Sequence, residues 1–551
     1  MHNEPRQRQN YADILDQLKT FFPGPTSNPI MDGYFVHTVS HFLDRVDSLK
    51  SAAPILGIEQ KKRYENGGGF PERMSSVEEM TEMLADYCQG MIVWAHPNCQ
   101  AQVIAPPTVP SIMAFVAGAI YNPNILSDEY SARFAEAELE AIAMLCGLVG
   151  YDPQKAGGNF TFGGTGTILY GCKLGLEKLF SGRLMNDGLR EDVKIVTSAS
   201  SHYTRLNAAG WLGMGTRNVV PIPATRNNEM SLIDLERYLR RALEGGEKIA
   251  AIIATMGTTD AFGIDDLSAI VHLRDQLAEE YNLEHPPHIH ADSVIGWAWI
   301  VFRDYDFEAN PLGFHARTLR SLRDSVELVR ALSMADSLGI DFHKTGYAPF
   351  ISSVFLVKDR NDLKLLSREP EQMPYLYRYG RYNPGIYTLE CSRSGASALA
   401  ALVNIRLLGK EGYRVIIGHV VEMSEMLRER LEAYPFVQIL NDYNYGPVTL
   451  FRVYPDGVNP REAFQREQAD PHYRKNLEEH NAYNRHIFEH IHEQALAGKG
   501  VLLSWTENYR QAGYDAAPPI AAIKSFIMSP WTGFDAVDTV ARQVARAREQ
   551  G

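Results

Sequence analysis

A lysine near the middle of the chain is the first residue whose setting suggests chemistry. Lys344 stands between His343 and Thr345, directly after the alternating segment 335–341. That alternation predicts a strand that ends just before the lysine. A lysine placed there can be held by packing while its amine faces a cleft, as a lysine that forms a Schiff base requires. For an isolated His-Lys pair, the alternative is an ordinary surface lysine.

Two upstream segments end in residues that could share this cleft. The apolar run 249–255 is closed by Gly257-Thr258-Thr259, and the alternating run 288–292 ends at Asp292. Both runs predict buried strands of a parallel sheet. Because ligands of open α/β sheets bind outside the carboxyl ends of the strands, we expect the threonines, the carboxylate and the lysine to meet in one crevice.

A glycine-rich turn supplies a third kind of group. Residues 160–167 read Phe-Thr-Phe-Gly-Gly-Thr-Gly-Thr, and 168–180 has the pattern of a helix. Glycines let backbone N–H groups approach a phosphate, and the N-terminus of a helix favours negative charge. A lysine for an aldehyde, an acid for a ring nitrogen and a cradle for a phosphate are what pyridoxal 5′-phosphate requires. Taken alone, the Gly-Gly-Thr-Gly string would be an ordinary tight turn.

The order of these motifs resembles that of the pyridoxal-phosphate-dependent group II amino-acid decarboxylases. The resemblance runs from about His96 to beyond Gly412. Its segments are His96-Pro97 with Pro106-Pro107, Ser131 to Glu138, Gly163 to Thr167, Ser201 to Thr204, Ala254 to Thr259 with Asp265, His290 to Asp292, and Ala335 to Lys344. Segments 343–349 and 389–396 are most similar to the bacterial tyrosine decarboxylase and aspartate 1-decarboxylase branch.

The resemblance implies a fold, an activity and a set of site residues. The fold would be the α/β fold type I of pyridoxal-phosphate enzymes, with a mostly parallel sheet flanked by helices. The activity would be decarboxylation of an L-amino acid to its amine and CO₂. Lys344 would carry the cofactor, Asp292 would keep the ring nitrogen protonated, and His202 would stack on the ring and orient the substrate carboxylate. The other expected cofactor contacts are Gly164, Thr165, Gly166, Thr167, Thr259 and His343.

The sequence also departs from the family pattern. Ser293 and Val294 follow Asp292 where two small residues are usual, Phe342 replaces a proline, and 168–170 lacks a common asparagine. Such changes could alter the substrate, the rate or the outcome of the reaction. Two alternatives therefore stay open: a carbon–carbon lyase or aldehyde-forming oxidative relative, and a cofactor-binding protein without catalysis.

Length and composition limit the class of protein. A chain of 551 residues predicts two or three domains. Its formal net charge of −13 argues against nucleic acid or an anionic membrane as a partner. Five scattered cysteines without a Cys-x-x-Cys pair, a polar start and no long apolar run predict a cytoplasmic protein that acts on a small molecule.

The first 105 residues predict a helical arm. Apolar residues recur at helical spacing over 11–22, 33–49 and 77–94. Such an arm is a poor domain by itself, and the resemblance implies that it packs across a partner in a homodimer whose active site lies at the subunit interface. The alternative is a helical cap on a single subunit.

The rest of the chain predicts two domains. Residues 106–395 alternate helices with short apolar strands and would form the large cofactor-binding domain. Residues 396–551 would form a smaller α+β domain, in which the charged segment 460–481 has the composition of an insertion.

The histidines before Asp292 raise a metal hypothesis. His288, His290 and Asp292 alternate on one strand face, and His285 precedes them. Imidazole and carboxylate groups bind zinc, but Pro286-Pro287 separates His285 from the others and Asp292 already has a role. We therefore expect no metal.

A long stretch after the lysine predicts a lid. Residues 361–388 are rich in Tyr, Arg, Pro and Gly, and long irregular stretches in compact enzymes often cover a site. The resemblance implies a mobile tyrosine here that donates a proton, although no particular tyrosine is indicated. Arg378 or Arg381 could bind a substrate carboxylate, or either could be a solvated loop charge.

Overall fold

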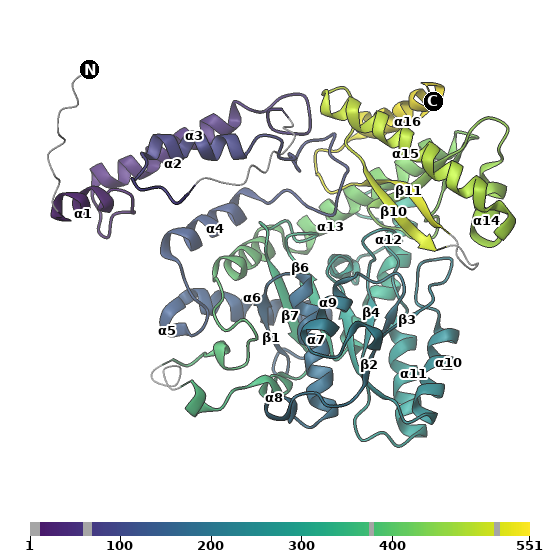
Figure 1. Cartoon of the computed structure of the whole chain (residues 1–551), viewed down its shortest axis with the longest axis horizontal. Helices are drawn as coiled ribbons and strands as arrows, with labels where there is room; N and C mark the ends of the chain where they lie inside the picture. The colour runs from purple at the N-terminus through teal and green to yellow at the C-terminus, as the bar shows by residue number, and fades with distance from the viewer. Residues whose placement is uncertain (1–10, 59–68, 374–379, 512–517, 551) are drawn as a thin grey trace. The chain divides into compact units, whose positions relative to one another are not determined.

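The computed structural model describes residues 11–58, 69–373, 380–511 and 518–550 (Figure 1). The chain divides into two compact units, one within residues 1–93 and 494–499 and the other within 94–493 and 500–551. The second unit contains two separate β-sheets. The predicted domain boundaries near 105 and 395 remain predictions.

The N-terminal unit contains the three expected helices, of which the first and third end earlier than their sequence patterns and the second begins four residues earlier. They are α1 (Tyr11–Lys19), α2 (Pro29–Asp47) and α3 (Val77–Tyr87). The Asn28 side chain caps α2, and Ser76 with Glu79 forms a capping box on α3. Helices α2 and α3 pack together, yet no residue of α2 is buried.

A seven-stranded sheet forms the centre of the second unit. Its strands are β1 (Gly157–Thr161), β2 (Val193–Ser198), β3 (Val219–Ile222), β4 (Lys248–Thr255), β5 (His288–Asp292), β6 (Ser337–Asp341) and β7 (Ser353–Val357). They lie in the order β1-β7-β6-β5-β4-β2-β3, and only β7 runs antiparallel to its neighbours. The predicted mostly parallel sheet is confirmed, as are the strands expected at 249–255 and 288–292.

Helices cover both faces of this sheet, as its apolar strands require. On β4, Ala250 and Ile253 pack with α7 and α9, whereas Ile249 and Ile252 belong to the larger core on the other face. The helices of this region are α4 (Val109–Tyr121), α5 (Asp128–Ser131), α6 (Arg133–Val149), α7 (Gly164–Leu179), α8 (Leu184–Asp187), α9 (Thr204–Trp211), α10 (Leu232–Glu244), α11 (Leu267–Glu280) and α12 (Ala316–Val329).

Glycines let α7 lie directly on the sheet. A Cβ at Gly175 would meet Ala250 O at 2.4 Å, and one at Gly171 would meet the His290 ring at 2.5 Å. A glycine on β6 also allows α7 to approach closely, because a Cβ at Gly339 would lie 2.3 Å from Thr167 Oγ1. Because Gly171 lies against His290 and Gly175 against His288, α7 runs antiparallel to β5, and its N-terminus lies at the carboxyl ends of the strands.

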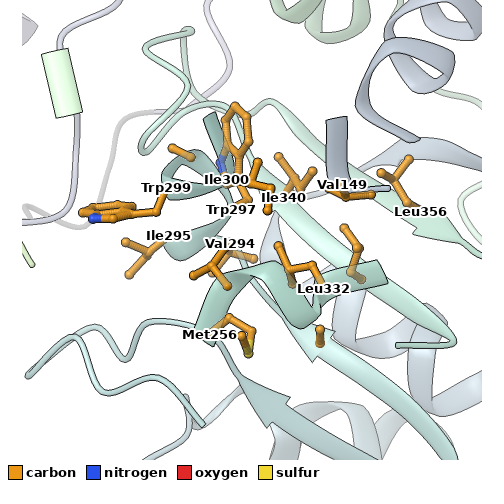
Figure 2. Packing of buried hydrophobic residues seen from close by; sticks show 14 of the residues in the cluster. Val149, Met256, Val294, Ile295, Trp297, Trp299, Ile300, Leu332, Ile340 and Leu356 are labelled. Carbon is orange, nitrogen blue, oxygen red and sulfur yellow. The ribbon is translucent and has the colours of Figure 1, made fainter. Parts of the chain in front are cut away.

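The core continues up to these strand ends. Figure 2 shows Val294 and Ile295, just after β5, next to Trp297 and Trp299. All four are buried and share one hydrophobic cluster with Ile340 of β6. The segment after Asp292 is therefore fixed by packing.

A four-stranded antiparallel sheet forms the C-terminal part. Its order is β10 (Ser504–Gln511), β11 (Pro519–Phe526), β9 (Val448–Val453) and β8 (Val437–Ile439). Its helices are α13 (Ala396–Glu432), kinked at Gly409, α14 (Pro460–Ala469), α15 (Arg474–Leu496) and α16 (Phe534–Gln550). No helix among the described residues is long and apolar enough to cross a membrane.

The charged segment 460–481 is helical: it forms α14 and the start of α15. Glu467 of α14 is fully buried, pairs with Arg452 of β9 at 3.1 Å and accepts a hydrogen bond from the Tyr454 hydroxyl at 2.9 Å. This ion pair belongs to the core of the C-terminal part, whereas other charged residues of the segment, such as Arg461 and Glu462, are exposed. That the segment is an insertion stays a prediction.

Candidate active site

A pocket of about 350 Å³ opens at the carboxyl ends of β4, β5 and β6. It brings together seven of the nine predicted site residues: Gly164, Thr165, His202, Thr259, Asp292, His343 and Lys344. Its other walls include Phe162, Val294 and Asp341, with Phe350 and Ile351. Because these residues span almost two hundred positions of the chain, the sheet topology creates the site.

The first turn of α7 forms one wall. The helix begins at Gly164, four residues earlier than its sequence pattern predicts, and Gly163 before it has a φ of 93°, which favours glycine. The N–H groups of Gly166 and Thr167 both bond Gly163 O. The N–H groups of Gly164 and Thr165 precede these bonds and lie at the pocket, where they form a cradle for an anion.

Asp292 is a buried acid at the end of β5. Its Oδ1 has no hydrogen-bond partner among the described residues, and its side chain lines the pocket. Burial raises the pKa of this carboxyl to about 6, against the opposing effect of the Lys344 charge. A buried carboxylate oxygen without a partner is costly, so the free Oδ1 favours a ligand with a cationic or N–H group.

Lys344 forms a buried ion pair. Its Nζ lies 2.9 Å from Asp341 Oδ2, with 17% of the lysine side chain and 1% of the aspartate exposed. The Ser353 hydroxyl donates to Asp341 Oδ1 at 2.5 Å. Burial opposes ionisation of Asp341, but Lys344, His343 and Ser353 outweigh it, so the pKa of the carboxyl lies below its ordinary value.

His202 lies on the loop between β2 and α9. The Thr204 N–H donates to His202 Nδ1 at 3.3 Å, which leaves Nε2 to carry the ring proton. Burial, reinforced by the Lys344 charge, lowers the pKa of this imidazole to about 4. His202 is therefore neutral at physiological pH and can stack on a flat ligand.

A braced loop carries Thr259. Asp265 accepts the N–H of Thr255 at 2.7 Å and that of Met230 at 2.6 Å, and the Thr258 hydroxyl accepts the Gly263 N–H at 2.9 Å. Asp265, which belongs to the sequence motif, thus holds the loop in place through hydrogen bonds to backbone N–H groups.

Two predicted cofactor residues do not line the pocket. Thr167 is fully buried, and its hydroxyl donates to Gly164 O at 2.8 Å. Gly166 faces Thr161, whose Oγ1 would lie 2.4 Å from a Cβ. Both residues shape the first turn, which is the contribution that the structure gives them.

The histidines of the metal hypothesis bond to a serine. His288 Nε2 and His290 Nδ1 lie 2.7 and 2.9 Å from Ser337 Oγ. Among the described residues, no group of three or more His, Cys, Asp or Glu is arranged to hold a metal ion.

The predicted lid falls partly outside the described residues, which exclude 374–379 and hence Arg378. Arg381 is exposed, and its backbone N–H donates to Asp128 at 3.1 Å. The Tyr382 hydroxyl donates to buried Glu138 at 3.0 Å. Neither residue lines the pocket, and the lid stays a prediction.

Asp341 and Ser353 are the site residues that sequence reasoning missed. Asp341 closes the same alternating segment that pointed to Lys344 and stands three positions before it. The three-residue spacing between Asp341 and Lys344, followed by the serine pair 352–353, is the sequence feature that could have indicated their role.

Pyridoxal phosphate fits this pocket on three observations. The amine of Lys344 lines the pocket, Asp292 Oδ1 is buried without a hydrogen-bond partner, and the N-terminus of α7 can bind an anion. A Cβ on Gly164 would partly fill that cradle, lying 3.1 Å from both Asp341 Oδ2 and Val294 Cγ1. The donor set therefore suits an aldehyde, a ring nitrogen and a phosphate.

The fold and site define a pyridoxal-phosphate enzyme of fold type I, and similarity to known proteins narrows the class. Residues 68–453 match the pyridoxal-dependent decarboxylase conserved domain. The chain belongs to the pyridoxal-dependent decarboxylase family, whose members are carboxy-lyases, and its cofactor is pyridoxal phosphate. It catalyses pyridoxal-phosphate-dependent amino-acid decarboxylation.

Individual relatives agree with this assignment. The chain is 26% identical over 428 residues to an L-2,4-diaminobutyrate decarboxylase of Acinetobacter baumannii, covering 73% of this chain and 78% of the relative. It is 24% identical over 435 residues to an L-tyrosine decarboxylase of Enterococcus faecium, covering 66% and 70%. Its fold matches the glutamate decarboxylase domain of a Vibrio parahaemolyticus diaminobutyrate-pyruvate transaminase and L-2,4-diaminobutyrate decarboxylase. In that match the TM-score is 0.74 at 19% identity, over 98% of this chain and all of the other.

Proposed function

We propose that Lys344, Asp292 and His202 carry the decarboxylation of an L-amino acid to its amine and CO₂. The observation behind this proposal is that a lysine, an unpaired buried acid and a helix N-terminus line one pocket. No single one of these groups would suffice. Together they match the aldehyde, ring nitrogen and phosphate of the family's cofactor.

Each group has a defined task. When bound, pyridoxal phosphate supplies a conjugated ring that takes up the electrons released as CO₂ leaves. Asp292, ionised above pH about 6, holds a proton on the ring nitrogen and so favours that flow. Lys344 Nζ would be the attachment point for the cofactor aldehyde, in the same pocket that would admit the substrate amine.

Other residues orient and bind. The N–H groups of Gly164 and Thr165 hold the phosphate at the α7 N-terminus. His202, whose Nδ1 accepts from the Thr204 N–H, would pack on the ring and have Nε2–H to offer to the carboxylate that is lost. Phe162, Phe350 and Ile351 limit the entry of water beside the reacting atoms.

We further propose that the enzyme is a homodimer. Helix α4 exposes Val109, Ile112, Met113 and Val116, which lie on one face at helical spacing. Phe350 and Ile351 at the pocket are also exposed, at 62% and 43%. A second copy of the chain would cover such apolar surfaces and complete the site. In the N-terminal unit, the lack of any buried residue on α2 supports the same role for the arm.

The proposed compartment is the cytoplasm. All five cysteines are free, and burial raises the pKa of the Cys99 thiol to about 11. Unpaired and unreactive thiols suit a reducing environment.

Product analysis tests the function directly. The cofactor-saturated protein would be incubated with the twenty amino acids, ornithine and 2,4-diaminobutyrate, and the products identified by mass spectrometry. We expect one amine lighter than its parent by CO₂. An aldehyde would instead favour the oxidative alternative, and no product with normal cofactor binding would favour a catalytically silent protein.

A lysine variant tests the assignment of the site. Lys344→Ala should form no covalent link to the cofactor that borohydride can trap, and amine production should fall by at least about 10³-fold, because the attachment point is gone. In the wild type, the trapped cofactor should be found on the peptide that contains residue 344. Finding it on another peptide would refute the assignment.

A further inference from the structure

The carboxylate beside Lys344 has no task in the mechanism above. Asp341 is 1% exposed, 2.9 Å from Lys344 Nζ and 3.5 Å from His343 Nε2. Ser353 fixes its other oxygen at 2.5 Å. A buried charge held so firmly is expensive to maintain, which suggests a use beyond stability.

The position of Asp341 relative to α7 adds a second constraint. Its Oδ2 lies 3.1 Å from the point where a Gly164 Cβ would stand, so it borders the cradle proposed for the phosphate. An ionised carboxylate at that point would repel a phosphate dianion in a region of low dielectric constant. The site therefore favours a neutral Asp341 once the cofactor has bound.

Lys344 has the opposite need. An ammonium is not a nucleophile, and the amine must lose a proton before it can attack an aldehyde. Asp341 Oδ2 is a carboxylate oxygen 2.9 Å from Nζ in an ion pair, and it has no hydrogen-bond partner of its own among the described residues, so it is free to take a proton.

We propose that Asp341 accepts the proton that the Lys344 ammonium must lose before its amine joins the cofactor aldehyde. This inference rests on the proposed role of Lys344. One transfer converts the ammonium–carboxylate pair into an amine and a neutral carboxyl group. The amine nitrogen then forms a double bond to the aldehyde carbon, and the aldehyde oxygen leaves as water with the two remaining amine protons.

The same transfer prepares the cradle. The neutral Asp341 carboxyl no longer repels the phosphate and has an O–H to donate to it. The proton that moves from Lys344 to Asp341 thus couples the reaction with the aldehyde to the binding of the phosphate, and it stays within the site.

The surroundings of Asp341 allow this exchange. The charged or titratable groups that act on it from the packed elements are Lys344 and His343 after β6, His202 before α9 and Asp292 at the end of β5. Strand β7 presents the neutral Ser353 hydroxyl, and α7 presents its N-terminus. Burial holds the pKa of both His202 and His343 below the ordinary value, so neither imidazole competes as a cation near neutral pH.

The first test is the kinetics of cofactor capture. Cofactor-free wild type and Asp341→Asn would be mixed with pyridoxal phosphate in a stopped-flow spectrometer across neutral to alkaline pH. The wild-type rate should change little with pH. The variant should be about 10²-fold slower near neutral pH and accelerate about tenfold per pH unit, since only solvent can take the proton. A variant with the wild-type rate and pH profile would overturn the proposal.

Pyridoxine 5′-phosphate, which has an alcohol in place of the aldehyde, separates capture from phosphate binding. Asp341→Asn should bind it at least as tightly as the wild type does, because the variant removes a negative charge from the cradle. Weaker binding of this probe would mean that Asp341 serves the structure of the pocket, and would count against the proposal. As a control, Gly210→Ala on α9, with open space around its Cβ, should keep the wild-type pH profile of capture.

The second test needs no variant to fold. The infrared difference spectrum of wild type, with pyridoxal phosphate minus without, should gain a protonated-carboxyl band that shifts in D₂O. Pyridoxine 5′-phosphate should not produce it. If pyridoxal phosphate is captured and trapped on Lys344 without this band, the role of Asp341 is wrong and the proposed function stands. If nothing is trapped on Lys344, the proposed function itself fails.

Discussion

Replacing Asp292 by asparagine should make the cofactor-free protein more stable at alkaline pH. The folded carboxyl has a pKa of about 6, whereas an aspartate in an unfolded chain titrates near 4. Between these values the folded protein holds a proton that the unfolded chain has released. Its stability therefore falls as pH rises from about 4 to about 6 and is constant above that range.

The size of the effect follows from the shift. A difference of about two pKa units corresponds to about 3 kcal/mol, since each unit is worth about 1.4 kcal/mol. Asparagine has nearly the shape of a protonated aspartate and cannot ionise. The cofactor-free Asp292→Asn protein should thus match the wild type near pH 4 and exceed it by up to about 3 kcal/mol near pH 8.

The cofactor should reverse this order. Ionised Asp292 favours a protonated ring nitrogen, and asparagine does not, so pyridoxal phosphate should stabilise the wild type more than the variant. For the same reason, wild-type cofactor affinity should fall as pH drops below about 6, where Asp292 is protonated.

Urea unfolding followed by circular dichroism at both pH values, with and without cofactor, measures these differences. Tryptophan fluorescence gives a second readout of the same transition, since Trp297 and Trp299, two of the six tryptophans, are fully buried a few residues after Asp292 (Figure 2). A cofactor-free variant less stable than the wild type near pH 8, or with the same pH dependence, would refute the reasoning.

Two further predictions concern the cradle and the assembly. Gly164→Ala places a methyl group 3.1 Å from Asp341 and Val294 and should weaken pyridoxal-phosphate binding about tenfold in equilibrium titrations, whereas Gly210→Ala on α9, with open space around its Cβ, should not. Light scattering should give wild type twice the mass of one chain. Val116→Asp on the exposed face of α4 should yield monomers, while Ile233→Asp on α10, at a still more exposed position, should not, and a monomeric wild type would contradict the homodimer.

The strands around the site could be predicted because burial on both faces requires a short, nearly continuous apolar run in the sequence. The run 249–255 has apolar residues on both faces. In 288–292, polar residues alternate with apolar ones, and His288 and His290 face α7. The ends of both strands, and with them Asp292, could therefore be placed from the sequence. Strand β10 could not, because it lies at a sheet edge and carries exposed polar residues such as Glu507.

Contacts that depend on turn geometry were also beyond the sequence. The start of α7 at Gly164 follows from the backbone of Gly163, and no periodicity records it. Likewise, the Asp341–Lys344 pair exists because the turn after β6 returns the lysine toward the strand end. The motif named the residues of the phosphate turn without separating Gly164 and Thr165, which line the pocket, from Gly166 and Thr167, which pack behind it.

The departures from the family pattern differ in what they can affect. Phe342 is fully buried against Trp297, with ring centroids 5.0 Å apart, and does not line the pocket, so its replacement of a proline is a matter of core packing. Val294 does line the pocket, and its Cγ1 would lie 3.1 Å from a Gly164 Cβ, next to the cradle. Since this valine narrows the space between Asp292 and α7, it is the departure that can tilt a bound ring and select which substrate bond stands perpendicular to it. A change of substrate or outcome in this branch of the family is therefore to be sought at position 294 before position 342.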